Sequence, residues 1–179
     1  MAHRKQPPFV TREGFSLLDD ICAEIDKLVK AAADLEGMEA QIGWFEEAAY
    51  NDGTPVAAIA NIHEHGAPAA GIPPRRPIAL SHEEHGEEWE KSLTRGVKAV
   101  TDGRITAKSM FTQLAQKVAG DQRETLSRIT DPPLKDSTIK ARMRRRGISG
   151  VSGDIAQPLN DTGHMIATLT GVAVPRSEE

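Results

Sequence analysis

The stretch MEAQIGW, residues 38–44, alternates apolar and polar residues and so departs from the helical spacing on either side of it. Met38, Ala40, Ile42 and Trp44 occupy every second position, which is typical of a half-buried strand. Residues 165–174 are rich in β-branched and apolar residues, and we expect a second strand there. Because the two strands lie at opposite ends of the sequence, the fold should close only when its C-terminal segment is in place.

The remaining sequence has mainly helical spacing. Apolar residues at steps of three and four predict an N-terminal helix that ends at Gly37. Further helices are expected over 54–65, 89–101 and 107–129, the last with a weak point at Gly120, and a short basic helix over 136–146. The expected fold class is α+β: a small antiparallel sheet packed with about four to five helices, in a single domain with an N-terminal helix.

The ends and loops follow from local composition. We expect a flexible N-terminal arm over 1–12, one α+β domain over 13–174, and a C-terminal tail over 175–179. A Gly/Ser-rich segment at 147–157 is expected to be mobile. Residues 66–77 hold four prolines, which fix φ and restrict their neighbours, so this loop should be stiff.

Composition excludes several classes of protein. With 39% hydrophobic and 27% charged residues in 179, the chain can bury a core, and 4% aromatics make that core aliphatic. A net charge of −4 argues against a general nucleic-acid binder. One cysteine, Cys22, cannot form an internal disulfide. No signal peptide or membrane span is visible, so a soluble domain of cytoplasmic type is expected.

Four histidines raise the possibility of a metal site. His63 and His65 lie two apart, and His82 and His85 lie three apart, whereas zinc on a helix favours histidines four apart. A zinc-dependent hydrolase that uses these four residues, with Glu64 or Glu83 as general base, is kept as an alternative. Solvated or packed histidines account for the pattern more simply, and we expect no metal and no cofactor.

A search for a nucleophile finds no catalytic constellation. Cys22 lies on the apolar face of the first helix, where a small thiol is ordinary. Asp161, Thr162 and Gly163 form one Asp-Thr-Gly triplet, but aspartic-protease chemistry needs two carboxylates that share a proton. We interpret the triplet as a structural turn in which Asp161 caps the backbone, and we expect a protein that is not an enzyme.

The strongest charge feature is the run KARMRRR, residues 140–146. Residues 135–146 carry six basic side chains and one acidic one, and an acidic stretch at 83–90 has the opposite sign. The two patches could each solvate a face of the domain, or could dock onto each other between copies in a head-to-tail ring. The arginines could also contact nucleic acid through phosphates, as in a small DNA-binding module that uses the 140–146 helix.

Four stretches, in this order, resemble the phage virion-morphogenesis and tail-completion (neck, head–tail joining) proteins, a family that includes the minor tail protein Z of phage lambda. They are VAAIANIHEHG at 56–66, IPPRRP at 72–77, PLKDSTIKARMRRRG at 133–147 and PLNDTGHM at 158–165. The resemblance covers residues 55–174, about two thirds of the chain. His65 stands where the family usually has an aromatic residue, and Arg76 interrupts its Arg-Pro step.

The resemblance implies a structural virion protein of a tailed phage or prophage, located in the tail or neck, and in the host cytoplasm during assembly. It implies a homo-oligomeric ring, most simply a hexamer, that joins head to tail and contacts connector or stopper proteins and tail terminator or tail tube proteins. DNA would pass through the lumen without sequence-specific contacts. A stiff loop loses little entropy on docking, which suits such a contact. The predicted oligomer or partner interface consists of Pro73, Pro74, Arg75, Arg76, Pro77, Arg142, Arg144, Arg145 and Arg146.

Overall fold

The computed structural model describes residues 12–147 and 153–177. In order, it contains α1 (Arg12–Glu36), β1 (Met38–Gly43), α2 (Val56–His65), a 3-10 turn η1 (Pro68–Ala70), α3 (Pro77–Thr101), α4 (Ala107–Arg128), α5 (Asp136–Arg146), α6 (Gly153–Ala156), α7 (His164–Thr168) and β2 (Thr170–Pro175). Two of the expected segments fall largely or partly outside the described residues. Of the expected arm at 1–12, the structure describes Arg12, which begins α1. Of the expected mobile loop at 147–157, residues 148–152 are outside the description.

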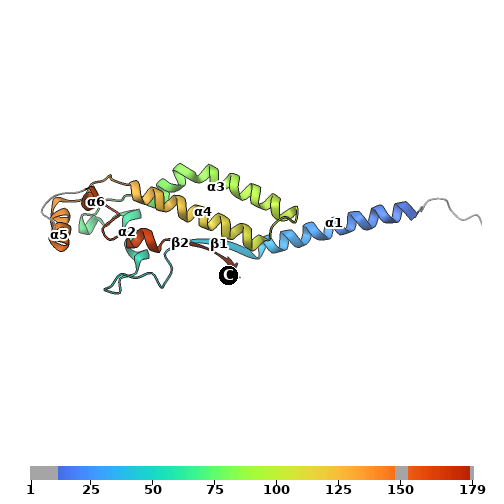
Figure 1. Cartoon of the computed structure of the whole chain (residues 1–179), viewed down its shortest axis with the longest axis horizontal. Helices are drawn as coiled ribbons and strands as arrows, with labels where there is room; N and C mark the ends of the chain where they lie inside the picture. Colours follow the sequence, from blue (N-terminus) through green and yellow to red (C-terminus); the bar gives the residue numbers. More distant parts are fainter. Residues whose placement is uncertain (1–11, 148–152, 178–179) are drawn as a thin grey trace, which may run out of the picture.

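The sheet pairs the two strands that the sequence predicts. β1 and β2 are antiparallel, with Met38 opposite Pro175 and Gly43 opposite Thr170. α4 packs across both strands, and α3 lies on the other side of α4 (Figure 1). At Gly171 the approach is so close that an added Cβ would clash with the backbone oxygen of Ala115. The α+β fold class with an N-terminal helix is therefore confirmed.

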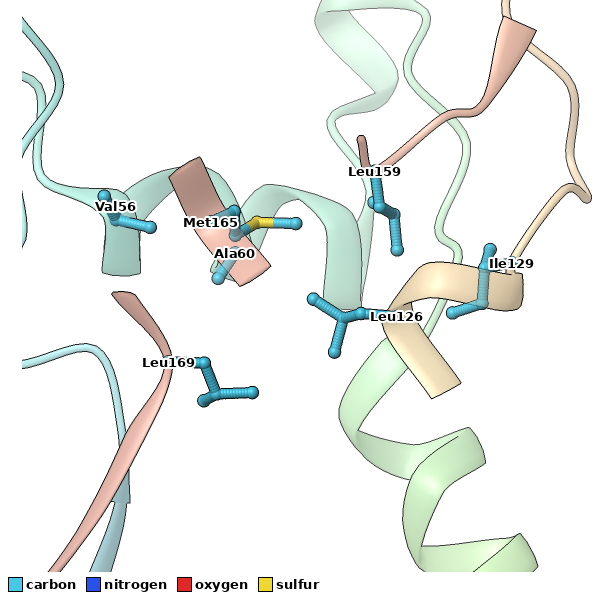
Figure 2. Close-up of a cluster of buried hydrophobic side chains, with 7 residues drawn as sticks. All are labelled: Val56, Ala60, Leu126, Ile129, Leu159, Met165 and Leu169. Atoms are coloured by element: carbon cyan, nitrogen blue, oxygen red, sulfur yellow. The ribbon is translucent and has the colours of Figure 1, made fainter. Parts of the chain in front are cut away.

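Two aliphatic clusters hold the body together. The larger one joins α2, the end of α4 and the segment around α7 (Figure 2); its members are Val56, Ala60, Leu126, Ile129, Leu159, Met165 and Leu169. The smaller one fastens the end of α1 to α3 and α4 and consists of Ala31, Val100, Ala107 and Met110. Burial of one leucine in such a cluster contributes about 1.5–3 kcal/mol to the free energy of unfolding. The two clusters therefore stabilise the packing of these elements against one another.

Only the last part of α1 belongs to the body. Figure 1 shows the helix extending away from α3 and α4, while α5 and α6 lie at the opposite end of an elongated molecule. All residues from 19 to 30 are exposed, and the first buried residue within 19–36 is Ala31. The N-terminal helix was predicted, but the isolation of its apolar face was not.

Several boundaries differ from the predictions. Residues 164–168 form α7 and not the first part of the second strand, since Met165 packs as a helical residue against the main core. The second half of the expected mobile loop is held in place, because Ile155 in α6 is fully buried. α4 runs through Gly120 without a break. α2 begins at Val56 and not at residue 54, because Pro55 is its N-cap, and no side chain caps the helix.

Candidate interaction site at the α5 end

The proline loop is fastened by an arginine that lies inside it. Arg75 is 4% exposed, and its Nε and Nη2 donate to the carbonyl oxygens of Pro132 (2.9 Å) and Pro133 (3.3 Å). The backbone N–H groups of Arg75 and Arg76 both donate to the carbonyl of His63. The loop is thus tied to the end of α2 and to the segment before α5, which agrees with the stiffness expected from its prolines.

The start of α3 is capped from α2. The carboxylate of Glu64 accepts hydrogen bonds from the backbone N–H groups of Ile78 (2.8 Å) and Ala79 (3.2 Å). A carboxylate in this position satisfies donors that the first turn leaves open and matches the helix dipole. Arg76, which takes a left-handed conformation with φ 48°, forms an ion pair with Glu83 at 2.8 Å. The two glutamates considered as general bases therefore stabilise this corner.

Arg142 is the centre of a second buried network. It is 7% exposed, and its guanidinium donates to the backbone oxygens of Ile155, Gln157 and Pro158 at 2.7–3.2 Å. Its Nε lies 3.5 Å from Oδ1 of Asp161. One side chain of α5 thereby fixes the path of the chain from α6 to the Asp-Thr-Gly turn.

Asp161 has a different role from the one predicted for it. Its carboxylate pairs with three arginines of α5, at 3.5 Å from Arg142, 2.6 Å from Arg145 and 3.6 Å from Arg146. The turn itself is closed by Thr162, whose hydroxyl accepts the backbone N–H of His164, and by Gly163 at φ 73°. The triplet does form a structural turn, but Asp161 is an ion-pair partner and not a backbone cap.

His63 lies between the two buried arginines. Its Nδ1 is 3.5 Å from Nη1 of Arg75. Burial chiefly, and then the positive charges of Arg75 and Arg142, lower the pKa of His63 to about 4. The imidazole is therefore neutral at physiological pH and can accept a hydrogen bond from Arg75.

Beside this network lies an open pocket of about 320 Å³. Its walls include Tyr50, His63, Arg145, Asp161 and His164. The rings of Tyr50 and His164 are 5.1 Å apart, and Nε2 of His164 lies 2.9 Å from the carbonyl of Ala49. Two of the polar wall residues thus have partners within the chain, since His164 is bonded to the carbonyl of Ala49 and Asp161 is paired with Arg145.

The surface outside the two networks is basic. Lys140 and Arg144 lie one turn apart on the exposed face of α5, and within the described residues no carboxylate is paired with either. Lys135 stands at the other end of the helix, with its ammonium 2.6 Å from the place a side chain at Gly71 would begin. Its position links the basic helix to the proline loop.

Burial narrows the predicted interface. Arg75, Arg142 and Pro77 are buried within the monomer, so they cannot offer their side chains to a partner. Arg145 and Arg146 are partly neutralised by Asp161. Pro74, Arg76 and Arg144 remain exposed, and Pro73 is half-buried. Because Arg76 is paired with Glu83, Arg144 is the exposed predicted arginine for which the described residues supply no carboxylate partner, with Lys140 beside it.

The acidic stretch on α3 is mostly satisfied within the chain. Glu83 pairs with Arg76, Glu84 with Arg128, Glu87 with Lys91 and Glu88 with Lys117. Glu84 also accepts a hydrogen bond from the hydroxyl of Thr125 at 2.8 Å. Docking of this stretch onto the basic helix of another copy would have to compete with these pairs, which weakens that version of a head-to-tail ring.

The four histidines do not meet. His63 faces Arg75, His65 is exposed, and the rings of His82 and His85 lie 5.9 and 6.2 Å from the ring of Trp89. Across residues 12–147 and 153–177, no group of three or more histidine, cysteine, aspartate or glutamate side chains is placed to hold a metal ion. The zinc-hydrolase alternative therefore gains no support from the geometry.

Comparison with known proteins finds no match: no family model, no curated protein and no solved structure is similar to this chain at a significant level. None of the helices in the described part of the chain is long and apolar enough to cross a membrane.

Sequence reasoning missed two features that define the site. One is the inward position of Arg142, although Ile139 and Met143 lie on the same side of α5 and could have indicated it. The other is Arg123, whose Nε donates to the carbonyl of Leu169 at 3.1 Å and ties α4 to the entry of β2. No local pattern around Arg123 distinguishes it from a solvated arginine.

Proposed function

We propose that this chain is a structural, non-enzymatic protein of a tailed-phage virion, which assembles with its own copies into a ring at the neck and joins the tail to the head. The observation that carries the proposal is that two unlike exposed surfaces lie on α1 and α5, at opposite ends of an elongated chain (Figure 1). One end is a helix with an exposed apolar face, and the other is a basic surface on α5 and the proline loop.

A joining protein needs both kinds of surface. It must bind its own copies, and it must also dock onto a different protein above or below the ring. The basic end is suited to docking because its loop and helix are already ordered by Arg75 and Arg142, so little conformational entropy remains to be lost. The family resemblance over 55–174 supplies the assignment to the neck, and a hexamer is the copy number that it implies.

The test is a joining assay with charge-reversed variants of the basic end. Arg144→Glu combined with Lys140→Glu reverses the two exposed basic side chains of α5 that have no carboxylate partner among the described residues, without touching the buried network. In a phage that carries this gene, we expect filled heads and complete tails to accumulate unjoined. Lys108→Glu, an exposed lysine on α4, is the matched control and should leave joining intact. Normal yields of joined particles from the double variant would overturn the proposal.

The basic surface on α5 also supports a second candidate function, which is binding of DNA. Lys140 and Arg144 are exposed on α5, Lys135 is exposed at its N-cap, and all three could neutralise phosphates of DNA without reading sequence. This DNA-binding module predicts binding of a short duplex that weakens steeply as salt is raised and that is lost in the Lys140→Glu, Arg144→Glu variant. Equal binding by that variant would exclude it.

A further inference from the structure

Residues 19–30 of α1 have an apolar face that nothing in the described part of the chain covers. Ile21, Ile25, Leu28 and Val29 are 47%, 53%, 44% and 62% exposed, and they account for four of the six exposed large hydrophobic residues in the described part of the chain. Single apolar residues scattered over a protein surface are ordinary. Apolar residues that line up along one face of a helix form a contiguous patch, and such a patch marks an interaction surface.

The spacing of these residues specifies the shape of the partner. Ile25 and Ala32 occupy position a of a heptad, Ile21, Leu28 and Leu35 occupy position d, and Cys22 and Val29 occupy position e. Every charged residue from 19 to 34 falls at b, c, f or g: Asp19, Asp20, Glu24, Asp26, Lys27, Lys30 and Asp34. An a/d repeat with charge kept to the other positions is the seam of a helical coiled coil or bundle.

We propose that α1 packs along this seam against α1 of other copies of the chain. The stripe is self-complementary, since the same a and d residues supply knobs and holes on both helices. At its C-terminal end the stripe meets the body of the chain, where Leu35 at position d and Ala31 at the neighbouring position g pack with the cluster of α3 and α4. The apolar residues at e widen the face beyond that of a simple pair and leave room for a second neighbour.

The stability expected for the exposed segment of α1 also favours association between copies. An isolated helical segment of this length is marginal in water, and most helices are stabilised by packing of an apolar face. Residues 19–30 are all exposed, so no described part of the chain buries the apolar face of this segment. Their helix is therefore stabilised by association, and helix content should rise as the copies assemble.

The charge of α1 distinguishes packing of α1 against α1 from docking of α1 onto α5 of another copy. Residues 19–36 carry six acidic and two basic side chains, so packing α1 against α1 brings like charges together and should strengthen when salt screens them. Docking of acidic α1 onto basic α5 of another copy would instead weaken with salt. The apolar seam would also find little to cover it there, since Ile78 is the one exposed large hydrophobic residue described near that end.

This inference deepens the proposed function, because it names the surface through which copies of the chain meet. Only the biological role of the assembly rests on the proposed function. The test compares the full-length chain with Ile25→Asp and with Ala23→Asp, by light scattering and far-ultraviolet circular dichroism over a concentration series. Ala23 is exposed at position f, so its variant adds the same charge to the opposite face and costs more in helix propensity.

We expect the wild type and Ala23→Asp to assemble and gain helix with concentration, and Ile25→Asp to stay monomeric with lower helix content. Assembly of Ile25→Asp to the wild-type extent would overturn the inference while leaving a ring through other surfaces intact. A wild-type chain that stays monomeric at every concentration, loss of assembly in Ala23→Asp, or dissociation by about 0.5 M salt would each overturn it too.

Discussion

Arg142 and Asp161 connect two motifs that are 19 positions apart in sequence: Nε of the arginine lies 3.5 Å from Oδ1 of the aspartate, and the same guanidinium serves three backbone carbonyls. The pair therefore fixes α5 against the chain that leads into α7. The basic helix and the Asp-Thr-Gly turn, which look like separate motifs in the sequence, form one structural unit.

Removing this guanidinium should damage the fold and not merely the surface. Arg142→Ala removes the donor from three backbone carbonyls, and the bonds to two of them, Ile155 and Pro158, are buried. Each buried carbonyl left without a donor costs about 1–3 kcal/mol, so we expect the unfolding free energy to fall by at least about 2 kcal/mol. Urea unfolding measures it. Arg144→Ala, on the exposed face of the same helix, is the control and should leave the midpoint unchanged. Equal midpoints for the two variants would show that the Arg142 network contributes nothing.

His63 should make stability depend on pH. Because its pKa is lowered from 6.5 to about 4, the unfolded chain binds a proton between these values while the folded chain does not. Its contribution to stability is therefore full above pH 6.5 and is lost as the pH falls towards 4. His63→Gln, which cannot titrate, should show a smaller loss of unfolding free energy between pH 7.5 and 5 than the wild type. An identical loss in both proteins would contradict this environment for His63.

The cap that Glu64 provides to α3 should be measurable. Glu64→Ala removes the acceptor for two backbone N–H groups, and the loss of such a cap costs about 1 kcal/mol of unfolding free energy. Glu90→Ala removes an exposed glutamate further along the same helix and serves as the reference. Thermal unfolding of the two variants compares them directly, and a larger effect at Glu90 would be inconsistent with the cap.

Two glycine-to-alanine substitutions should have opposite effects. At Gly171 the new Cβ would lie against the backbone of Ala115 in α4, and we expect a loss of about 2 kcal/mol or more. At Gly120, in the middle of α4, nothing lies within 4 Å, so alanine should stabilise the chain by about 0.5–1 kcal/mol. Chemical unfolding of both variants gives the signs, and a stabilising change at Gly171 would refute the close packing of β2 on α4.

The strand pair and the main helices could be predicted because each depends on periodicity within a short window. The alternation at 38–44 and the three-and-four spacing of α1, α3 and α4 survive in the fold. Residues 165–169 were harder, because an apolar, β-branched run fits a strand and a short buried helix equally well. Packing of Met165 and Leu169 into the main core decides between them.

The site was predicted less well, since charge in a sequence does not reveal burial. Arg75 and Arg76 are adjacent and chemically identical, yet one guanidinium is buried among backbone carbonyls and the other is exposed. What separates them is the path of residues 131–133, which lies 57 positions away in sequence. In the same way, amphipathic spacing predicts that α1 has an apolar face but not whether its own chain covers it.

The measurement that tests the central claim most directly is the mass of the full-length chain in solution, by light scattering after gel filtration across a concentration series. The account predicts one closed assembly with a fixed number of copies, six by the family resemblance, and therefore roughly six times the 19.4 kDa of the chain. A species of 19.4 kDa at every concentration would contradict it.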